Sequence, residues 1–253
     1  MKFSIIIPSY NQAEFIEETI MNTLEVKARA RQIGQEVEIL LFDSESNESV
    51  QQILNKYKDQ LDVLEVKKDK GQYDAINKGI ERSSGDYWTW LNTDDTLDVE
   101  GVLKLMIVLN EESGIDYIYG GIDYTNTAGE ITRSFEAVPV DLKTMITAVP
   151  GIFQQGSFFR KAFTDGIGLL KPYNCCFDYE YVLRVLKAGG KMKVCRFKVA
   201  NFRQHNASKT GSITPVFIRE QLEISKAYGR KPFHFLTWFS HLRLIKHKLF
   251  PRS

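Results

Sequence analysis

The first 95 residues alternate short strand-like runs with amphipathic helical patterns. The strand-like runs, rich in β-branched and aromatic residues, are Phe3 to Pro8, Val37 to Phe42, Val63 to Val66 and Tyr87 to Leu91. Apolar residues at helical spacing separate them, over Glu14 to Arg31, Val50 to Lys58 and Tyr73 to Arg82. This alternation is typical of βαβ units, so the sequence predicts an α/β fold with a mainly parallel sheet flanked by helices.

Polar residues gather where the predicted strands end. They are Ser9, Tyr10 and Asn11 after the first strand, Asp43 and Ser44 after the second, and Asp94 and Asp95 after the fourth. Right-handed crossovers bring the carboxyl ends of parallel strands to one edge of the sheet, where open α/β folds bind ligands. The pattern therefore predicts a ligand site at that edge.

The same residue types also cap helices, which gives a second interpretation of this clustering. Ser46 and Asn47 stand just ahead of the helix predicted at Val50, and we expect them to cap it. Asp43 fits a cap and a ligand contact equally well.

The pattern is looser after Asp95. The segments with helical or strand character are a helix at Leu103 to Leu109, strands at Tyr117 to Tyr124, Ile131 to Phe135 and Gln155 to Arg160, and a helix at Tyr179 to Lys187. Because no linker or repeat interrupts them, we expect one domain over residues 1–211, with residues 1–95 and 96–211 as its two halves. Residues 212–253 form a separate C-terminal helical extension in this division.

Composition excludes several classes of protein. Lys and Arg total 33 against 32 for Asp and Glu, so the overall charge does not favour binding of nucleic acid. Three cysteines, two of them the neighbours Cys175 and Cys176, supply neither a disulfide framework nor a zinc spacing. The first apolar run is too short for a signal peptide, and no stretch is long enough to span a membrane. We expect a cytoplasmic protein, at most attached to the inner face of the membrane.

Phosphate-binding glycine motifs are absent. PSYNQAEF, at the first strand end, contains no glycine fingerprint, and no GK[ST] loop occurs. The acidic pair Asp94 and Asp95 suggests instead that Mg²⁺ or Mn²⁺ holds the phosphates, because oxygen ligands select these ions. Adjacent residues of an extended chain point to opposite sides, so one carboxylate would hold the cation and the other a sugar hydroxyl. Two solvated turn residues are the alternative.

Several ordered motifs resemble one enzyme family. FSIIIPSYNQAEFIEETIMNTL, LLFDSESNES and DKGQYDAINKGIERSSGDYWTWLNTDD are similar to the nucleotide-binding half of the family 2 glycosyltransferases, in order over residues 3–95. The resemblance continues more weakly through QQGSFFRKAF and CFDYEYVLRVLKAGGK to about Ser208. It implies the GT-A fold, a Rossmann-like mainly parallel sheet flanked by helices. In this fold residues 1–95 would be the nucleotide-binding half and residues 96–211 the acceptor-binding half.

The resemblance also implies roles for individual residues. Pro8, Ser9 and Tyr10 match the segment that lines the nucleotide base, Asp43 the carboxylate that binds the base, and Gly71 and Asp74 the donor-binding turn. Asp94 matches the ribose contact, Asp95 the metal ligand, and Asp178 the catalytic base, while His205 stands where some relatives add a metal contact. Apart from the resemblance, Lys209 in the polar loop that follows could close over the diphosphate.

Physical reasoning supports these roles to different degrees. A nucleoside diphosphate leaves readily when a cation stabilises its developing charge, and direct displacement then needs a base on the opposite face of the sugar. Asp178, at the head of the Tyr179 to Lys187 helix, has that position, although an N-cap role and a catalytic Glu180 remain alternatives. His205 also fits an ordinary surface histidine.

The sequence departs from the family pattern at several positions. Ser44 and Asn47 replace a frequent Gly and Asp, Asn92 replaces an Asp ahead of the acidic pair, and Phe177 replaces a Glu before the base. The Gln-x-x-Arg-Trp element of processive members is missing, which favours transfer of a single sugar.

The C-terminal segment is basic and amphipathic. From Ile224 onward there are seven Lys or Arg and no acidic residue. Its apolar stripe is Phe235, Trp238, Phe239, Leu242, Ile245 and Leu249. Such a helix suits an anionic membrane surface, and packing on its own domain or in a homodimer is the alternative.

These observations predict a metal-dependent inverting glycosyltransferase. It would use Mn²⁺ or Mg²⁺ to move one sugar from a nucleotide-sugar donor, UDP-linked by expectation, to a saccharide or lipid-linked saccharide acceptor in bacterial surface polysaccharide synthesis. A sugar-phosphate nucleotidyltransferase, a non-catalytic nucleotide-sugar binder and a scaffold protein are the rival hypotheses.

Overall fold

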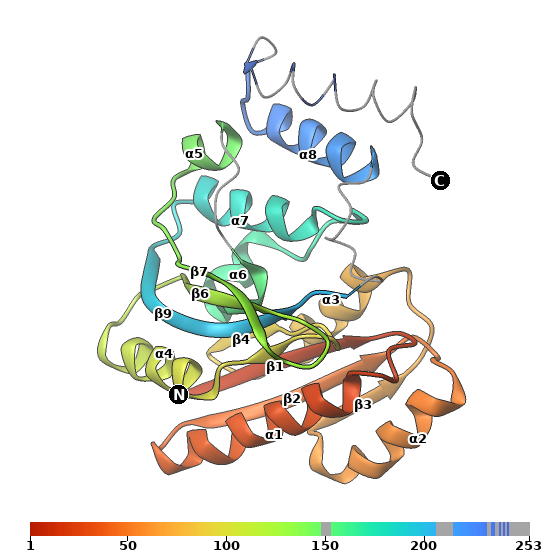
Figure 1. Ribbon diagram of the computed structural model, residues 1–253. Coiled ribbons are helices and arrows are strands. Elements are labelled where there is room, and N and C mark those ends of the chain that lie inside the picture. The colour runs from red at the N-terminus through yellow and green to blue at the C-terminus, as the bar shows by residue number, and fades with distance from the viewer. Residues whose placement is uncertain are drawn as a thin grey trace.

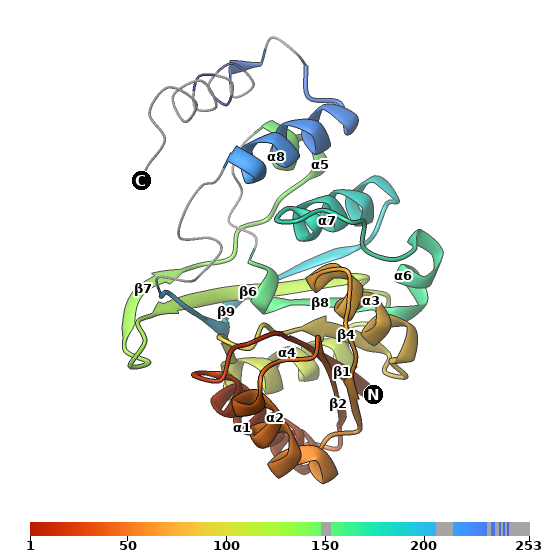
Figure 2. The same cartoon turned by 90° about the vertical axis from the view of Figure 1, so that its right-hand side faces the viewer.

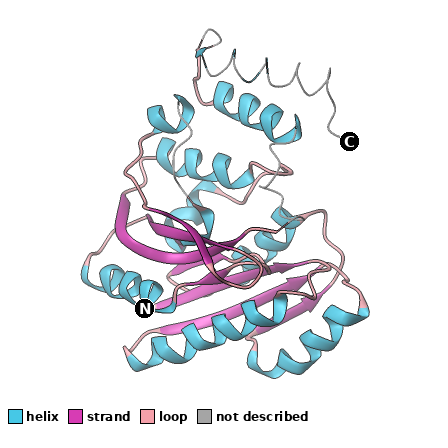
Figure 3. Ribbon diagram, in the orientation of Figure 1, coloured by secondary structure: helices cyan, strands magenta, loops and turns pink. Residues whose placement is uncertain are grey.

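A curled mixed sheet forms the centre of the molecule (Figures 1 and 3). The computed structural model describes residues 1–147, 153–205 and 215–231, and the single positions 234, 235, 238, 240 and 242. Within these residues the sheet has nine strands in the order β3-β2-β1-β4-β8-β6-β9-β5, and β7 pairs with β6 outside this path. The strands are β1 Lys2–Ser9, β2 Glu36–Asp43, β3 Val63–Val66, β4 Tyr87–Trp90, β5 Thr96–Leu97, β6 Tyr117–Thr125, β7 Ile131–Phe135, β8 Ser157–Arg160 and β9 Met192–Arg203.

The two halves of the sheet differ in strand direction. β1 to β4 pair in parallel, with Ser9 opposite Asp43 at the last position of the β1–β2 pair. β8 is antiparallel to both β4 and β6, while β6 and β9 are parallel. The parallel half therefore presents its carboxyl ends on one edge, as the sequence pattern predicts.

Helices cover both faces of the sheet (Figure 2). On one face lie α1 Ile16–Gln32, α2 Glu48–Tyr57 and α4 Val99–Glu111, and on the other lie α3 Gln72–Arg82, α6 Lys161–Ile167 and α7 Phe177–Lys187. Farther out, α5 Leu142–Thr147 packs on α7 and on α8 Pro215–Ala227. Two short 3₁₀ turns, η1 Lys58–Gln60 and η2 Gln154–Gly156, complete the elements.

Period-two alternation of the strands produces two hydrophobic cores. In β1, Ile5 and Ile7 join the core beneath α1, α2 and α4, whereas Ile6 joins the core beneath α3 and α7. Trp88 and Trp90 of β4 share the second core, stacked 5.9 Å apart. Both tryptophans therefore lie on one face of the sheet.

The pattern predicts the main strands and helices of the first half, but it does not predict β9. This strand has twelve residues, and the charged side chains of Lys193, Arg196 and Lys198 interrupt its apolar pattern. Only tertiary pairing with β6 and β5 makes it regular. No helix within the described residues is long and apolar enough to cross a membrane.

Candidate active site

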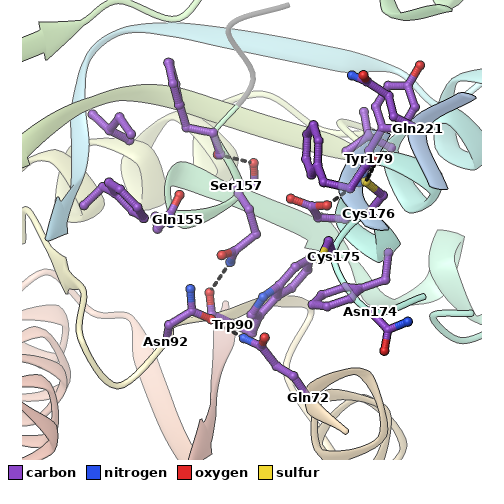
Figure 4. Close-up of a pocket in the computed structure, with 18 of the residues that line it drawn as sticks. Gln72, Trp90, Asn92, Gln155, Ser157, Asn174, Cys175, Cys176, Tyr179 and Gln221 are labelled. Carbon is purple, nitrogen blue, oxygen red and sulfur yellow. Dashed lines mark hydrogen bonds between the residues drawn. The ribbon is translucent and has the colours of Figure 1, made fainter. Parts of the chain in front are cut away.

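A cavity of about 380 Å³ opens above the end of β4. Its walls come from β4, η2, the start of α7 and the inner side of α8. In Figure 4, Gln221 of α8 lies across the cavity from Gln72 and Asn92. The cavity therefore joins the predicted donor edge of the sheet to the C-terminal helix α8.

Asp95 is buried at this edge and its carboxylate is fully hydrogen-bonded. Oδ1 accepts the backbone N–H of Arg203 at 3.0 Å, and Oδ2 accepts the side-chain amides of Asn92 at 3.1 Å and Gln155 at 3.0 Å. Burial, together with the neighbouring charge of Asp94, raises the pKa of Asp95 above its usual range. These neutral donors hold Asp95 in place beneath the site.

Asp94 lies in the turn just before Asp95 and meets His205. Its Oδ2 lies 2.9 Å from His205 Nε2, and the exposed fractions of the two side chains are 16% and 8%. The imidazole ring rests 5.0 Å from the ring of Phe15, which fixes its place at the end of β9. One carboxylate oxygen and one ring nitrogen thus lie side by side near the surface.

This pair has the chemistry of a small cation site. No group of three or more potential His, Cys, Asp or Glu ligands occurs within the part of the chain that the structure describes. A cation held by Asp94 and His205 would thus complete its shell with water and substrate phosphate, as Mg²⁺ and Mn²⁺ do. The donor set fits such an ion.

Arg203 braces the same turn. Its guanidinium donates to the backbone carbonyls of Asp94 and Thr127, and Glu18 Oε2 lies 2.6 Å from its Nη2. It also stacks over Phe15 at 4.9 Å. The buried arginine therefore ties β9 to the acidic turn and to α1.

Asp178 faces the cavity from the first turn of α7. The N-cap residue of this helix is Cys176, so Asp178 is not the cap, and its Oδ1 accepts the N–H of Tyr179 at 2.7 Å. Burial raises the pKa of Asp178 to about 6, and the charge of Glu220 acts in the same direction. A carboxylate with this pKa is ionised at neutral pH and basic enough to accept a proton.

Glu180, the alternative base, is held in a different environment. Its fully buried carboxylate lies 2.7 Å from Lys171 Nζ and 2.7 Å from Arg184 Nη2, and it accepts the hydroxyl of Tyr228 at 2.7 Å. Burial alone would raise its pKa, but the hydrogen bonds from these three partners outweigh burial and lower the pKa. Glu180 is absent from the cavity lining, so the geometry favours Asp178 as the base.

On the nucleotide side, Asp43 joins two loops. Oδ2 accepts the hydroxyls of Ser9 at 2.7 Å and Ser46 at 2.5 Å, and Oδ1 accepts the Ser46 N–H at 2.8 Å and the Gln51 amide at 2.7 Å. The Asn47 side chain caps α2 by accepting the N–H of Val50, as the sequence predicts. Asp43 therefore has a clear structural role at the strand ends.

The loop after β1 presents Tyr10 to solvent. Pro8 and Ser9 are buried, but 63% of Tyr10 is exposed. Asn11, at φ 53°, donates its N–H to Ser46 Oγ at 2.8 Å and accepts the Asn47 N–H at 2.9 Å. The two loops are thus cross-linked, and the tyrosine ring projects from a fixed frame.

The start of α3 forms the third part of this edge. Gly71, at φ 128°, makes a turn that strains any residue with a side chain, and Asp74 Oδ2 accepts the Lys70 N–H at 3.1 Å. Gln72 donates to Asn92 Oδ1 at 2.6 Å, which links this turn to the acidic turn. Asn77 instead binds both backbone groups of Leu170 and is structural.

Comparison with known proteins identifies the family. A sequence model described as "Glycosyl transferase family 2" matches residues 4–175, more than half of the chain. The chain belongs to this family. The prediction of a glycosyltransferase is therefore confirmed.

Relatives of this glycosyltransferase occur in several bacteria. It is 25% identical over 190 residues to a "PGL/p-HBAD biosynthesis glycosyltransferase" of Mycobacterium bovis (strain BCG / Pasteur 1173P2), covering 72% of this chain and 68% of that protein. It is 21% identical over 182 residues to the poly-beta-1,6-N-acetyl-D-glucosamine synthase of Staphylococcus aureus (strain COL), covering 65% of this chain and 41% of that one.

Solved structures share its fold. S. aureus TarS 1–349, in complex with UDP-GlcNAc, matches with a TM-score of 0.71 and 16% identity, over 100% of this chain and 76% of that one. The mannosyltransferase PcManGT from Pyrobaculum calidifontis, in complex with GDP-Man and Mn²⁺, matches with a TM-score of 0.65 and 14% identity, over 97% of this chain and 69% of that one. These likenesses confirm the predicted GT-A fold.

The glycosyltransferase brings most of its sequence-predicted site residues to one edge. Ser9 contacts Asp43, and Asp94 contacts His205, while Asp178 enters from α7 on the far side of the cavity. The sequence alone did not point to Gln72, Gln155, Arg203 or Gln221. Lys209 and the tail positions Phe239, Ile245 and Leu249 lie outside the described residues.

Proposed function

We propose that this family 2 glycosyltransferase transfers one sugar from a nucleotide-sugar donor to a hydroxyl acceptor, with inversion at the anomeric carbon. One observation carries the proposal. Among the described residues that line the cavity, Asp178 supplies the one carboxylate, with a pKa of about 6, while the Asp94–His205 pair lies at the strand edge where the donor would sit. A base on one side and a phosphate site on the other are what direct displacement needs.

The donor is a nucleoside diphosphate sugar. Two proteins of the same fold were solved with UDP-GlcNAc and with GDP-Man. The exposed ring of Tyr10, in its cross-linked loop, is suited to stacking on a base. We choose UDP-GlcNAc as the first donor to test, because the better-matching neighbour binds it.

Asp94 and His205 would hold the divalent ion, which supplies charge neutralisation at the departing diphosphate. Asp95 then supports the site from below through Asn92, Gln155 and the Arg203 backbone. The sequence resemblance implies the reverse assignment, with Asp95 on the metal and Asp94 on the ribose. The hydrogen-bonded, buried state of Asp95 favours Asp94 as the ion ligand.

Asp178 accepts the proton of the acceptor hydroxyl as its oxygen attacks the anomeric carbon. The aromatic side chains in the cavity wall, which include Trp90 and Tyr179, give an apolar surface beside this step. Gln72 and Asn92 present amide groups on the donor side and would orient sugar hydroxyls.

A panel of nucleotide sugars tests the proposal. Thermal unfolding of the whole chain is measured with UDP-GlcNAc, UDP-glucose and GDP-mannose, each with and without Mn²⁺. We expect one donor to raise the unfolding temperature in a Mn²⁺-dependent manner, and Asp94→Asn to abolish that dependence. Asp178→Asn should keep the stabilisation and lose transfer. If no donor stabilises the chain, or if Asp178→Asn transfers normally, the proposal is wrong.

We further propose that the acceptor is carried on a membrane lipid. Phe235, Trp238 and Leu242 are spaced as one helical stripe, and their exposed fractions are 67%, 66% and 41%. They lie in a segment with seven basic and no acidic residues from Ile224 onward. Apolar side chains beside basic ones suit an anionic membrane surface.

Vesicle sedimentation tests this part. The full chain should sediment with vesicles of 30% phosphatidylglycerol and less with neutral vesicles, and deletion of residues 233–253 should remove the difference. Light scattering of the full and shortened chains distinguishes a homodimer. If the full chain stays in the supernatant, or if the deletion changes only the oligomeric state, membrane docking is wrong.

A further inference from the structure

α8 belongs to the predicted C-terminal extension, yet it contacts the start of α7. The carboxylate of Glu220, a residue that is 9% exposed, accepts three consecutive backbone N–H groups. Oε1 accepts the N–H of Asn174 at 2.7 Å, and Oε2 accepts those of Cys175 at 2.9 Å and Cys176 at 3.1 Å. These N–H groups come just before the first turn of α7, which carries Asp178.

The contact is unusual because it replaces a local cap. The side chain of the N-cap residue, Cys176, makes no capping hydrogen bond. Glu220, 44 residues later in the chain, supplies the negative charge that a helix N-terminus favours. The neighbouring residues Phe217 and Gln221 of α8 line the cavity itself. One helix therefore forms part of the cavity wall and anchors the segment that presents the base.

We propose that Glu220 is a positioning residue for catalysis, which holds the 174–176 segment and keeps Asp178 aimed into the cavity. This inference rests on the proposed function, in which Asp178 is the base. A carboxylate bound to three N–H groups fixes the backbone more firmly than a neutral side chain, because charge-assisted hydrogen bonds are about twice as strong as neutral ones. The placement of the base thus depends on α8.

Glu220 also acts on Asp178 through its charge. Burial is the larger cause of the raised pKa of Asp178, and the negative charge of Glu220 adds to it. The other charged groups near the start of α7 are engaged elsewhere: Lys171 and Arg184 pair with Glu180 on the same helix. Burial raises the pKa of Tyr117 of β6 and of Cys176, so both groups are neutral. The charge of Asp178 also raises the pKa of Tyr117.

The test compares Glu220→Gln with two control variants. Glu223→Gln removes an exposed acid on the same helix, and Tyr228→Phe removes another α8-side contact to α7, the hydroxyl bound to Glu180. The pKa of Asp178 is measured by carboxyl NMR titration of the full chain. We expect it to be lower in Glu220→Gln than in the parent chain and to stay unchanged in both controls.

Activity is measured as hydrolysis of UDP-GlcNAc with Mn²⁺, in which water takes the sugar and UDP is released. Glu220→Gln should lower kcat by about 10- to 100-fold, as expected for a displaced catalytic group, with the donor KM unchanged and the acid limb of the pH profile moved to lower pH. Glu220→Asp, which keeps the charge, should recover part of kcat and the raised pKa. If Glu220→Gln is unfolded at the assay temperature, Glu220→Asp is the variant that tests the inference.

Two results would overturn the inference. One is an unchanged Asp178 pKa in folded Glu220→Gln, and the other is equal pKa values in Glu220→Asp and Glu220→Gln. The titration needs no substrate, so it stays decisive if UDP-GlcNAc is not the donor. If the proposed function itself is wrong, Asp178→Asn will instead keep full activity.

Discussion

The carboxylates of the first half of the sheet and the one at the start of α7 lie in opposite environments. Asp43 accepts four hydrogen bonds and Asp95 accepts three from neighbouring protein groups. Asp178 accepts one, from the adjacent backbone N–H, and faces a cavity. The pKa of Asp95 is raised as well, but Asp95 is not among the residues that line the cavity, whereas Asp178 faces the cavity and can meet a substrate proton.

Substitution of Asp178 should have the largest effect on the transfer rate. Asp178→Asn should reduce transfer by about 10²- to 10⁴-fold, the usual range for loss of a general base. In the parent chain, the rate should fall as pH drops through about 6, because protonation removes the base. Steady-state rates from pH 5 to 8 measure both effects. A pH-independent rate over this range would show that Asp178 does not act as the base.

Sequence reasoning finds residues whose partners are near in the chain and misses those whose partners are far away. The partners of Asp43 include Ser46 and Gln51, three and eight residues away, so the phrase DSESNESVQ already contains that frame. The partner of Asp95 in β9, Arg203, is 108 residues away. Local patterns therefore predict the strands, the helices and the Asn47 cap of the first half.

The second half depends on contacts that no local pattern encodes. β9 is regular because it pairs with β6 and β5, and charged side chains conceal its alternation. The choice between Asp178 and Glu180 rests on Lys171, Arg184 and Tyr228, which surround Glu180 only in the folded chain. Distant pairing is also why Glu220 escaped sequence reasoning.

A smaller effect is expected at Asp95, on stability. Asp95→Asn puts an amide where three N–H donors converge, and an unsatisfied buried donor costs about 1–3 kcal/mol. Asp94→Asn, one residue earlier and partly exposed, should change the free energy of unfolding far less while abolishing Mn²⁺-dependent stabilisation. Urea unfolding with and without Mn²⁺ separates the two. The reverse pattern would return the metal to Asp95, as the resemblance implies.

The smallest effect is expected at Tyr10, the exposed residue of the first half. Its loop is held by Asn11, Ser46 and Asn47, so replacing the ring should leave the frame and the fold intact. Stacking of a base on an aromatic ring contributes about 1–3 kcal/mol, and an open position should give the lower value, or about fivefold in affinity. Tyr10→Ala should therefore weaken UDP binding about fivefold in calorimetry, and Tyr10→Phe should not. Equal affinities for all three chains would mean that the base lies elsewhere, and that the rigid loop serves only the fold.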